Sequence, residues 1–172
     1  MVGCFDDVAW IRVEGPGSHQ NSDRIREFAH RRMESGTESF VVDLANCPTM
    51  DSTFMGTLTA LALELKRKGQ GDSEKTGIEI LNANERNRQS LVKLGLQHLI
   101  RIDEDGTAWE TERELVDQNL SRPLPGVDLD RQERMEMVLE AHEALVKANQ
   151  ENRSRFQDVL EYLQRDLESN SA

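Results

Sequence analysis

The 172-residue chain carries 32 acidic and 21 basic side chains, which gives a formal net charge of -11 at pH 7. Because so acidic a surface repels a phosphate backbone, we do not expect nucleic acid as a direct partner. No apolar segment is long enough to cross a bilayer, and the N-terminus lacks a basic region followed by an apolar run, so we expect a cytoplasmic protein without membrane insertion. The length suits one ordinary domain with an appendage.

The first elements follow from a change of hydrophobic period. Residues Val8 to Val13 are β-branched and aromatic and predict a strand, which ends at the breaker Gly15-Pro16-Gly17. A helical period then predicts a helix that starts at Ser22 or Asp23 and ends at Gly36.

The next two strands enclose an apolar helix. Residues 40–44 form a compact apolar run, typical of a strand buried on both faces. A helix is predicted from Ser52 to Lys68, where cations in the last turn and Gly69 favour a helix end with a left-handed cap. The polar, glycine-rich segment 69–77 leads into a third strand at residues 78–81.

The same alternation continues to Leu120. A helix is predicted from Asn82 or Asn84 through Leu96, followed by a short edge strand at residues 100–102 and a small helix within residues 106–120. Strands that alternate with helices predict an α/β sheet with helical crossovers.

The composition changes after Leu120. Residues 121–127 contain two prolines and a glycine, and they predict a linker between a domain at residues 1–120 and a helical extension at residues 128–172. The extension predicts one long helix or a pair, with an approximate heptad interrupted by two asparagines: Met135, Val138, His142, Leu145, Asn149, Asn152, Phe156, Val159 and Leu163. Two interpretations stay open: these residues pack back onto the domain, or they form a homodimer or dock on a partner.

The helix at residues 52–68 opens with three small polar residues, Asp51, Ser52 and Thr53, although one capping oxygen would suffice. A hydroxyl at a helix start is also well placed for phosphorylation, because the phosphate meets backbone amides and the positive end of the helix dipole. Close to two added negative charges beside Asp51 would repel a partner bound to this helix end. The triplet therefore predicts a switch as well as a cap.

Patterns for catalysis are missing. Ser52 lacks the flanking glycines of a nucleophile elbow, and no phosphate-cradling glycine-lysine loop exists. The four histidines are scattered, and Cys4 and Cys47 lack the paired spacing of a zinc site. We therefore expect reduced thiols and no catalytic residue, cofactor or metal.

At the triplet the chain resembles the STAS domain family, typified by bacterial anti-anti-sigma factors. That family has an apolar strand, a short turn and Asp-Ser-Ser or Asp-Ser-Thr at the start of a helix that usually continues Gly-Leu-Gly. The segment FVVDLANCPTMDSTFMGTL keeps this order and the later glycine as Gly56, and it departs with Phe54 in place of the first glycine. The resemblance covers roughly residues 6–120 and implies an α/β fold, with a small sheet of about four to five strands flanked by helices. The long C-terminal helical extension lies outside it.

The resemblance implies a non-enzymatic signalling module, an anti-sigma factor antagonist that regulates transcription by partner switching. Such a domain, when unphosphorylated, binds a serine kinase/anti-sigma factor of the histidine-kinase-like ATPase class. Phosphorylation releases the kinase, and a PP2C-like serine phosphatase resets the domain. Carried over to this chain, Ser52 is the phosphoacceptor with Thr53 as the fallback, and Asp51 shapes the site. Together with Phe54 and Met55, these residues are expected to form the partner-binding surface.

Two other functions stay open. The first is a STAS subunit that is not phosphorylated and serves a larger assembly, such as a stressosome-like scaffold or a lipid-transport ATPase complex, with oligomerisation through residues 128–172. The second is an enzyme or nucleotide-binding module that uses Asp51 and Ser52 directly. The sequence pattern pairs neither residue with a base histidine or a metal site, which disfavours the second function.

Overall fold

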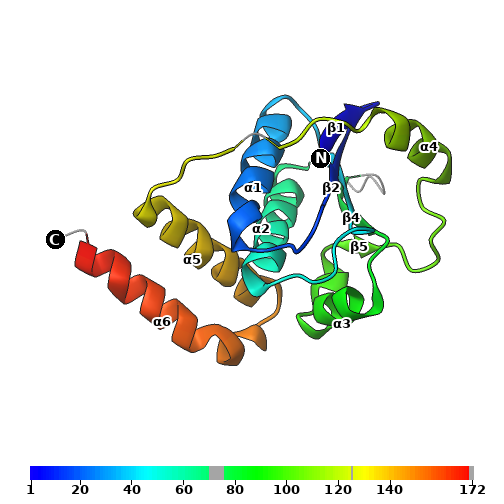
Figure 1. Cartoon of the computed structure of the whole chain (residues 1–172). Helices are drawn as coiled ribbons and strands as arrows, with labels where there is room; N and C mark the ends of the chain where they lie inside the picture. The colour runs from blue at the N-terminus through cyan, green and yellow to red at the C-terminus, as the bar shows by residue number, and fades with distance from the viewer. Residues whose placement is uncertain (70–75, 125, 171–172) are drawn as a thin grey trace.

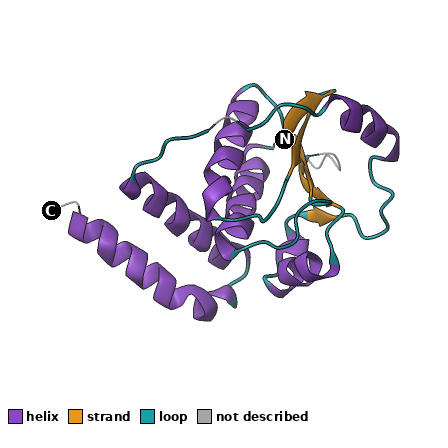
Figure 2. Ribbon diagram, viewed as in Figure 1, coloured by secondary structure: helices purple, strands orange, loops and turns teal. Residues whose placement is uncertain are grey.

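The computed structural model describes residues 1–69, 76–124 and 126–170, and its centre is a five-stranded sheet covered by helices (Figures 1 and 2). The strands lie side by side in chain order: β1 (Val2–Phe5), β2 (Val8–Arg12), β3 (Ser39–Asp43), β4 (Gly77–Leu81) and β5 (Arg101–Ile102). β1 is antiparallel to β2, and the other neighbours are parallel. The expected α/β fold is confirmed. Most of the expected loop at residues 69–77, Pro125 of the expected linker and the last two residues of the expected extension lie outside the described residues.

The strand β1 was not expected from the sequence. It forms a hairpin with β2 through Asp6 and Asp7, whose backbones are left-handed with φ of 44° and 65°. Two consecutive left-handed residues match the twist of a hairpin, and glycine or asparagine usually marks such a turn. The Asp-Asp pair carries no such mark, so the pattern at the N-terminus did not predict a strand there.

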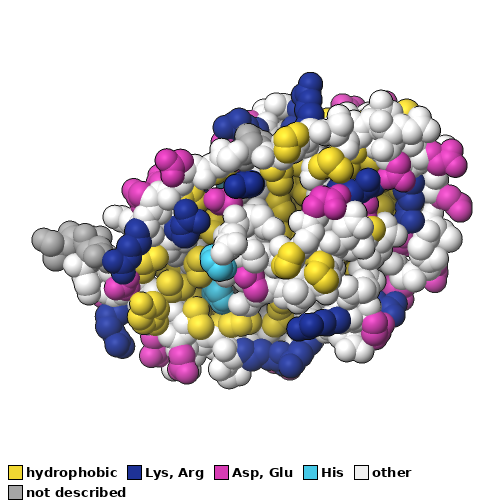
Figure 3. Space-filling model, in the orientation of Figure 1, with side chains coloured by type: hydrophobic (Ala, Val, Ile, Leu, Met, Phe, Trp, Pro, Cys, Tyr) yellow, Lys and Arg dark blue, Asp and Glu magenta, His cyan; other side chains and the backbone are white. Residues whose placement is uncertain are grey.

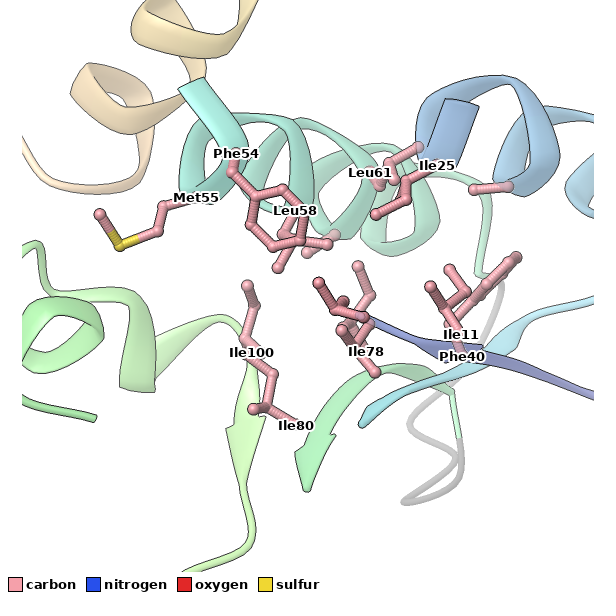
Figure 4. Close-up of a cluster of buried hydrophobic side chains, with 14 of the residues drawn as sticks. Ile11, Ile25, Phe40, Phe54, Met55, Leu58, Leu61, Ile78, Ile80 and Ile100 are labelled. Carbon is pink, nitrogen blue, oxygen red and sulfur yellow. The ribbon is translucent and has the colours of Figure 1, made fainter. Parts of the chain in front are cut away.

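Three helices cover one face of the sheet: α1 (His19–Glu34), α2 (Ser52–Lys68) and α3 (Glu85–Lys93). The side chains of Phe54, Leu58 and Leu61 project from α2 toward the strands, where they meet residues such as Ile78 (Figure 4). Leu58 and Leu61 are 1% and 3% exposed, so the prediction that this stripe faces the core is confirmed.

The cap of α1 differs from the expected one. Ser18 accepts an N–H of the first turn through its hydroxyl, and the side chain of Asn21 accepts the N–H of Ser18 in return. The prediction of Ser22 or Asp23 was wrong, because both residues already lie inside the helix and are buried. The reciprocal bonds of Ser18 and Asn21 satisfy the first turn four residues earlier.

Two other helix ends also depend on local backbone geometry. Asn84 caps α3, as expected, through a bond from the N–H of Asn87 to its side chain. The helix does not continue to Leu96, because Gly95 adopts a left-handed φ of 75°. Gly69 follows α2 with a φ of -68°, so the left-handed cap predicted there was wrong.

The helix α4 (Glu110–Asn119) covers the opposite face of the sheet. Arg12 of β2 ties it down, because its guanidinium donates to Asp43 of β3 at 2.8 Å and also to Asp117 of α4. A separate cluster of buried side chains joins β2, β3 and β4 to α4 and the residue that follows it: Trp10, Val41, Leu81, Val116 and Leu120.

The C-terminal segment forms two helices, α5 (Arg131–Ala148) and α6 (Asn152–Asn170), in a further layer outside α2 (Figure 1). Met137, Ala141 and Leu145 of α5 are buried against the rest of the chain. The structure therefore shows the interpretation in which the extension packs back onto the domain. No helix of the described residues combines the length and apolarity needed to cross a membrane.

The asparagines that interrupt the heptad form the corner between α5 and α6. Asn149 ends α5, and its N–H donates to the carbonyl of Leu145. Asn152 is fully buried, and its side-chain amide donates to the carbonyls of Leu94 and Leu145, each at 2.9 Å. These bonds pin the corner to the end of α3, which a continuous heptad seam could not do.

Candidate functional site

Asp51 ties together the starts of two helices. Its backbone is extended, and its Oδ1 accepts the N–H of Phe54 at 2.8 Å, so Asp51 is the N-cap of α2. Its Oδ2 accepts the N–H of His19, the first residue of α1, at 2.9 Å. Its own N–H donates to the carbonyl of Gly17 at 2.9 Å. One carboxylate thus fixes the loop after β2 against the start of α2.

Because Asp51 supplies the cap, the hydroxyl of Ser52 is free for another contact. Ser52 is the first residue of α2, and its Oγ lies 3.1 Å from Nε2 of His142 in α5. Nδ1 of His142 lies 2.8 Å from the carbonyl oxygen of Val138, which can only accept a hydrogen bond, so Nδ1 donates one to it. In the neutral imidazole Nε2 is then the acceptor, and Ser52 donates its hydroxyl proton to it.

The Ser52–His142 pair joins two helices in a closed contact. A serine beside a histidine is also the arrangement of a nucleophile and its base, and the sequence pattern alone gave no base to Ser52. His142 is only 3% exposed, and its ring meets that of Phe156 edge-on with 5.1 Å between centroids. A catalytic pair needs room for a substrate beside both groups, so the pair fits an interhelical contact better than a dyad.

The other residues of the expected partner surface face inward. Thr53, Phe54 and Met55 are 7%, 1% and 6% exposed. Phe54 covers Gly17, where an added Cβ would lie 2.8 Å from the ring. The expectation that Phe54 lies on a partner-binding surface does not match this position in the core. Of the five expected residues, only Asp51 and Ser52 are partly exposed.

Gly56 allows α5 to lie directly on α2. A Cβ added at Gly56 would lie 2.3 Å from the carbonyl oxygen of Ala141, which is too close for two unbonded atoms. Farther along, Ala60 of α2 and Ala144 of α5 line one shallow pocket between the two helices. The glycine that resembles the later glycine of the family helix is therefore covered by α5.

The composition of α2 contains a signal for this contact. From Ser52 to Leu63, α2 has no charged residue, so it has no charged face to turn toward water. Such a helix is expected to be buried on both sides, here by the sheet and by α5. The partner itself could not be read from the pattern, because His142 lies 90 positions from Ser52.

The chemistry around the site is that of buried and paired groups. Burial raises the pKa of the Cys47 thiol above its ordinary value, whereas Cys4 is exposed, and both are free cysteines. Within residues 1–69, 76–124 and 126–170, no three His, Cys, Asp or Glu side chains are grouped so that they could hold a metal ion.

Comparison with known protein families gives a match for the first part of the chain. The family model described as the STAS domain matches residues 2–108, so α5 and α6 lie beyond the matched range. No curated protein matches the chain.

Several solved structures share the fold. A proposed anti-sigma factor antagonist from Thermotoga maritima is 16% identical with a TM-score of 0.55, over 66% of this chain and 93% of that one. The anti-sigma factor antagonist SpoIIAA in its unphosphorylated form is 17% identical with a TM-score of 0.50, over 71% and 98%. A sulfate transporter family protein from Wolinella succinogenes is 18% identical with a TM-score of 0.50, over 67% and 92%. At these identities the likeness shows the fold alone.

Proposed function

This chain belongs to the STAS domain family, and on that premise we propose that it is an anti-sigma factor antagonist-like phospho-switch. In its unphosphorylated form it binds a serine kinase/anti-sigma factor of the histidine-kinase-like ATPase class. Phosphorylation of Ser52 releases that kinase, and a PP2C-like phosphatase restores the binding form. The chain performs no catalysis in this proposal, and it acts in the cytoplasm, where the kinase finds ATP.

The observation that supports the proposal is the division of roles between Asp51 and Ser52. Asp51 alone caps α2, so a group added to Oγ of Ser52 leaves the cap intact. The start of α2 offers backbone amides and the positive end of its dipole to a phosphate. The domain can therefore keep its fold while the charge at this helix end changes.

Thr53 is the poorer acceptor of the two hydroxyls. It is 7% exposed, and its carbonyl accepts the hydroxyl of Thr57 one turn later. Ser52 precedes it and is partly exposed. Ser52 is therefore the more exposed of the two hydroxyl-bearing residues.

The proposal is tested by capture with paired variants of the full chain. Immobilised Ser52→Ala and Ser52→Asp proteins are incubated with lysate of the source cells, and retained proteins are quantified by mass spectrometry. We expect an ATPase of the histidine-kinase-like class on Ser52→Ala, reduced at least about tenfold on Ser52→Asp, because like charge at an interface opposes binding. Ser121→Ala and Ser121→Asp, in an exposed segment, are the matched control pair. Equal retention by both Ser52 variants, or no such ATPase, would reject the phospho-switch.

A specific observation favours the scaffold as the second candidate. Val159 and Tyr162 of α6 are 38% and 63% exposed and lie three residues apart on one helix face. A subunit of a stressosome-like or lipid-transport ATPase assembly could use this face, and a homodimer through residues 128–172 is its simplest form. Light scattering distinguishes the two: an oligomer that Tyr162→Glu dissociates supports the scaffold, and a monomeric wild-type chain rejects the homodimer.

A further inference from the structure

We propose that α5 is a removable cover over Ser52. A modifying enzyme or a docking partner reaches Ser52 only after α5 leaves α2, and a phosphate on Ser52 keeps α5 from returning. The inference rests on the proposed phospho-switch for its biological meaning. In physical terms, α5 competes with the phosphate or with a docking partner for the same face of α2.

Two contacts one helical turn apart hold α5 against the start of α2, beside the partly exposed Ser52. Nε2 of His142 lies 3.1 Å from the Ser52 hydroxyl, and the carbonyl of Ala141 lies where a Cβ of Gly56 would be. Phosphoryl transfer requires the acceptor oxygen and the leaving oxygen to be in line on either side of the phosphorus. In the docked position this oxygen is paired with His142 of α5, so in-line attack from it requires that pairing to break, and departure of α5 breaks it.

A phosphate on Ser52 is incompatible with the docked position of α5. The phosphoester has no hydroxyl proton to donate, so the hydrogen bond from Ser52 to Nε2 of the buried His142 is lost. Three phosphate oxygens and close to two negative charges would have to fit beside that ring. An outward shift of α5 that made room for the phosphate would break the close packing of Ala141 on Gly56.

The cover contacts the domain mainly through α2. Phe54 and Leu58 of α2 are buried against the sheet, and Leu145 of α5 joins the same buried cluster. The rest of the junction between α2 and α5 contains Gly56 and the small side chains of Ala60 and Ala144. The ion pair from Arg26 of α1 to Glu140 of α5 is largely exposed and contributes little.

The position of α5 in the chain is consistent with an element that lies outside the STAS domain. The STAS family match ends at residue 108, before α5 begins at Arg131. On the side of the molecule seen in Figure 3, hydrophobic side chains gather over the region of α5 and α6. Local opening of such a peripheral element is a general property of folded proteins, with a free energy below that of global unfolding.

The opening of the cover can be measured directly by thiol labelling at position 52. The full chain carries Ser52→Cys together with Cys4→Ser, and Cys47 stays buried. Adding Gly56→Ala should speed labelling of the introduced thiol by about tenfold or more, because the new methyl overlaps the Ala141 carbonyl. Alanine favours the helical conformation of α2 itself, so faster labelling cannot come from a weaker α2.

The matched control is Gly126→Ala, where an added Cβ meets no atom within 4 Å. We expect it to label at the parent rate. Equal rates for Gly56→Ala and Gly126→Ala would overturn the proposal.

The effect of phosphate is measured by amide hydrogen exchange on the full chain with phosphoserine incorporated at position 52. We expect peptides of α5 to exchange at least about tenfold faster, while peptides of β3 and β4 keep their protection. Phosphoserine at position 121, in an exposed segment, controls for added charge. Unchanged exchange in α5 would overturn the proposal, and so would greater protection, which would mean that His142 holds the phosphate.

Neither experiment uses a kinase, so failure of the cover and failure of the phospho-switch can be told apart. If Ser52 is never phosphorylated in cells, the switch fails while the labelling result still stands. If α5 stays docked over phosphoserine and Gly56→Ala has no effect, the cover fails while Ser52 remains a phosphoacceptor.

Discussion

The two carboxylate oxygens of Asp51 hold two helix starts, at the amides of Phe54 and His19. Each bond satisfies an N–H that the first turn of a helix leaves without an intrahelical partner. Because one short side chain does this, Ser52 is free to meet His142, and the redundancy of the Asp-Ser-Thr triplet has a physical reason. The triplet itself could be predicted as a candidate site, since its residues are contiguous in the sequence. His142 could not, because a single sequence does not show which distant side chain reaches it.

We predict that Asp51→Ala lowers the free energy of unfolding by about 1 to 2 kcal/mol, because α2 loses its N-cap and α1 its tie to the same carboxylate. Urea denaturation of the full chain measures the loss. Asp51→Asn is the matched control, since asparagine keeps a capping oxygen and should lose less. Equal losses for the two variants would show that Asp51 does not act as the cap.

The two cysteines should differ in reactivity. Burial raises the pKa of Cys47, so less of this thiol is ionised near neutral pH than in a free cysteine, and it is also shielded from reagents. Cys4 is exposed. We predict that iodoacetamide at pH 7.5 labels Cys4 and spares Cys47 until denaturant is added, as read by peptide mass spectrometry. Labelling of Cys47 in the folded chain would contradict its placement in the core.

At the scale of elements, α2 is the most constrained part of the molecule, with the sheet on one side and α5 on the other. Its period and its core stripe could be predicted, because apolar spacing is a local property of the sequence. Its second buried face was not predicted, although the absence of charged residues from Ser52 to Leu63 indicates that α2 is buried on both sides. The corner at Asn149 and Asn152 was missed for a related reason, since these residues were judged as defects of a heptad and serve instead as a bend.

The core stripe of α2 is tested by comparing two leucines. Leu58→Ala should cost about 2 to 5 kcal/mol in free energy of unfolding, because Leu58 is 1% exposed and its loss leaves a cavity. Leu115→Ala in α4 is the matched control, because Leu115 is 52% exposed and its change should cost within about 0.5 kcal/mol. Thermal or urea unfolding of both variants measures the two changes in free energy of unfolding. Similar losses of stability would mean that α2 is wrongly oriented.

At the scale of the whole molecule, the chain joins a STAS domain to a pair of helices that cover its candidate switch residue. The order of strands and helices could be predicted because alternation of the two periods is visible along the chain. The sequence did not decide where the extension packs. The spacing of its apolar residues allows them to pack either on the domain or on a second copy of the chain. The burial of Leu145 and Leu163 within one chain resolves their packing in the structure.

With these seam residues buried inside one chain, we predict that the full-length protein is monomeric at micromolar concentration. Size-exclusion chromatography with light scattering should give a mass near 19.6 kDa. A stable dimer of the wild-type chain would instead favour the scaffold, with the exposed face of α6 as the first surface to mutate.

The most direct test of the central claim, that Ser52 is a switch residue, is phosphopeptide mass spectrometry on the protein purified from its native cells. Fragment spectra distinguish phosphate on Ser52 from phosphate on Thr53, and Thr49 in the same segment serves as an internal reference. The account predicts partial phosphorylation of Ser52 that varies with growth conditions, with none on the buried Thr53. Ser52 unmodified under every condition would contradict it and leave the triplet as a helix cap.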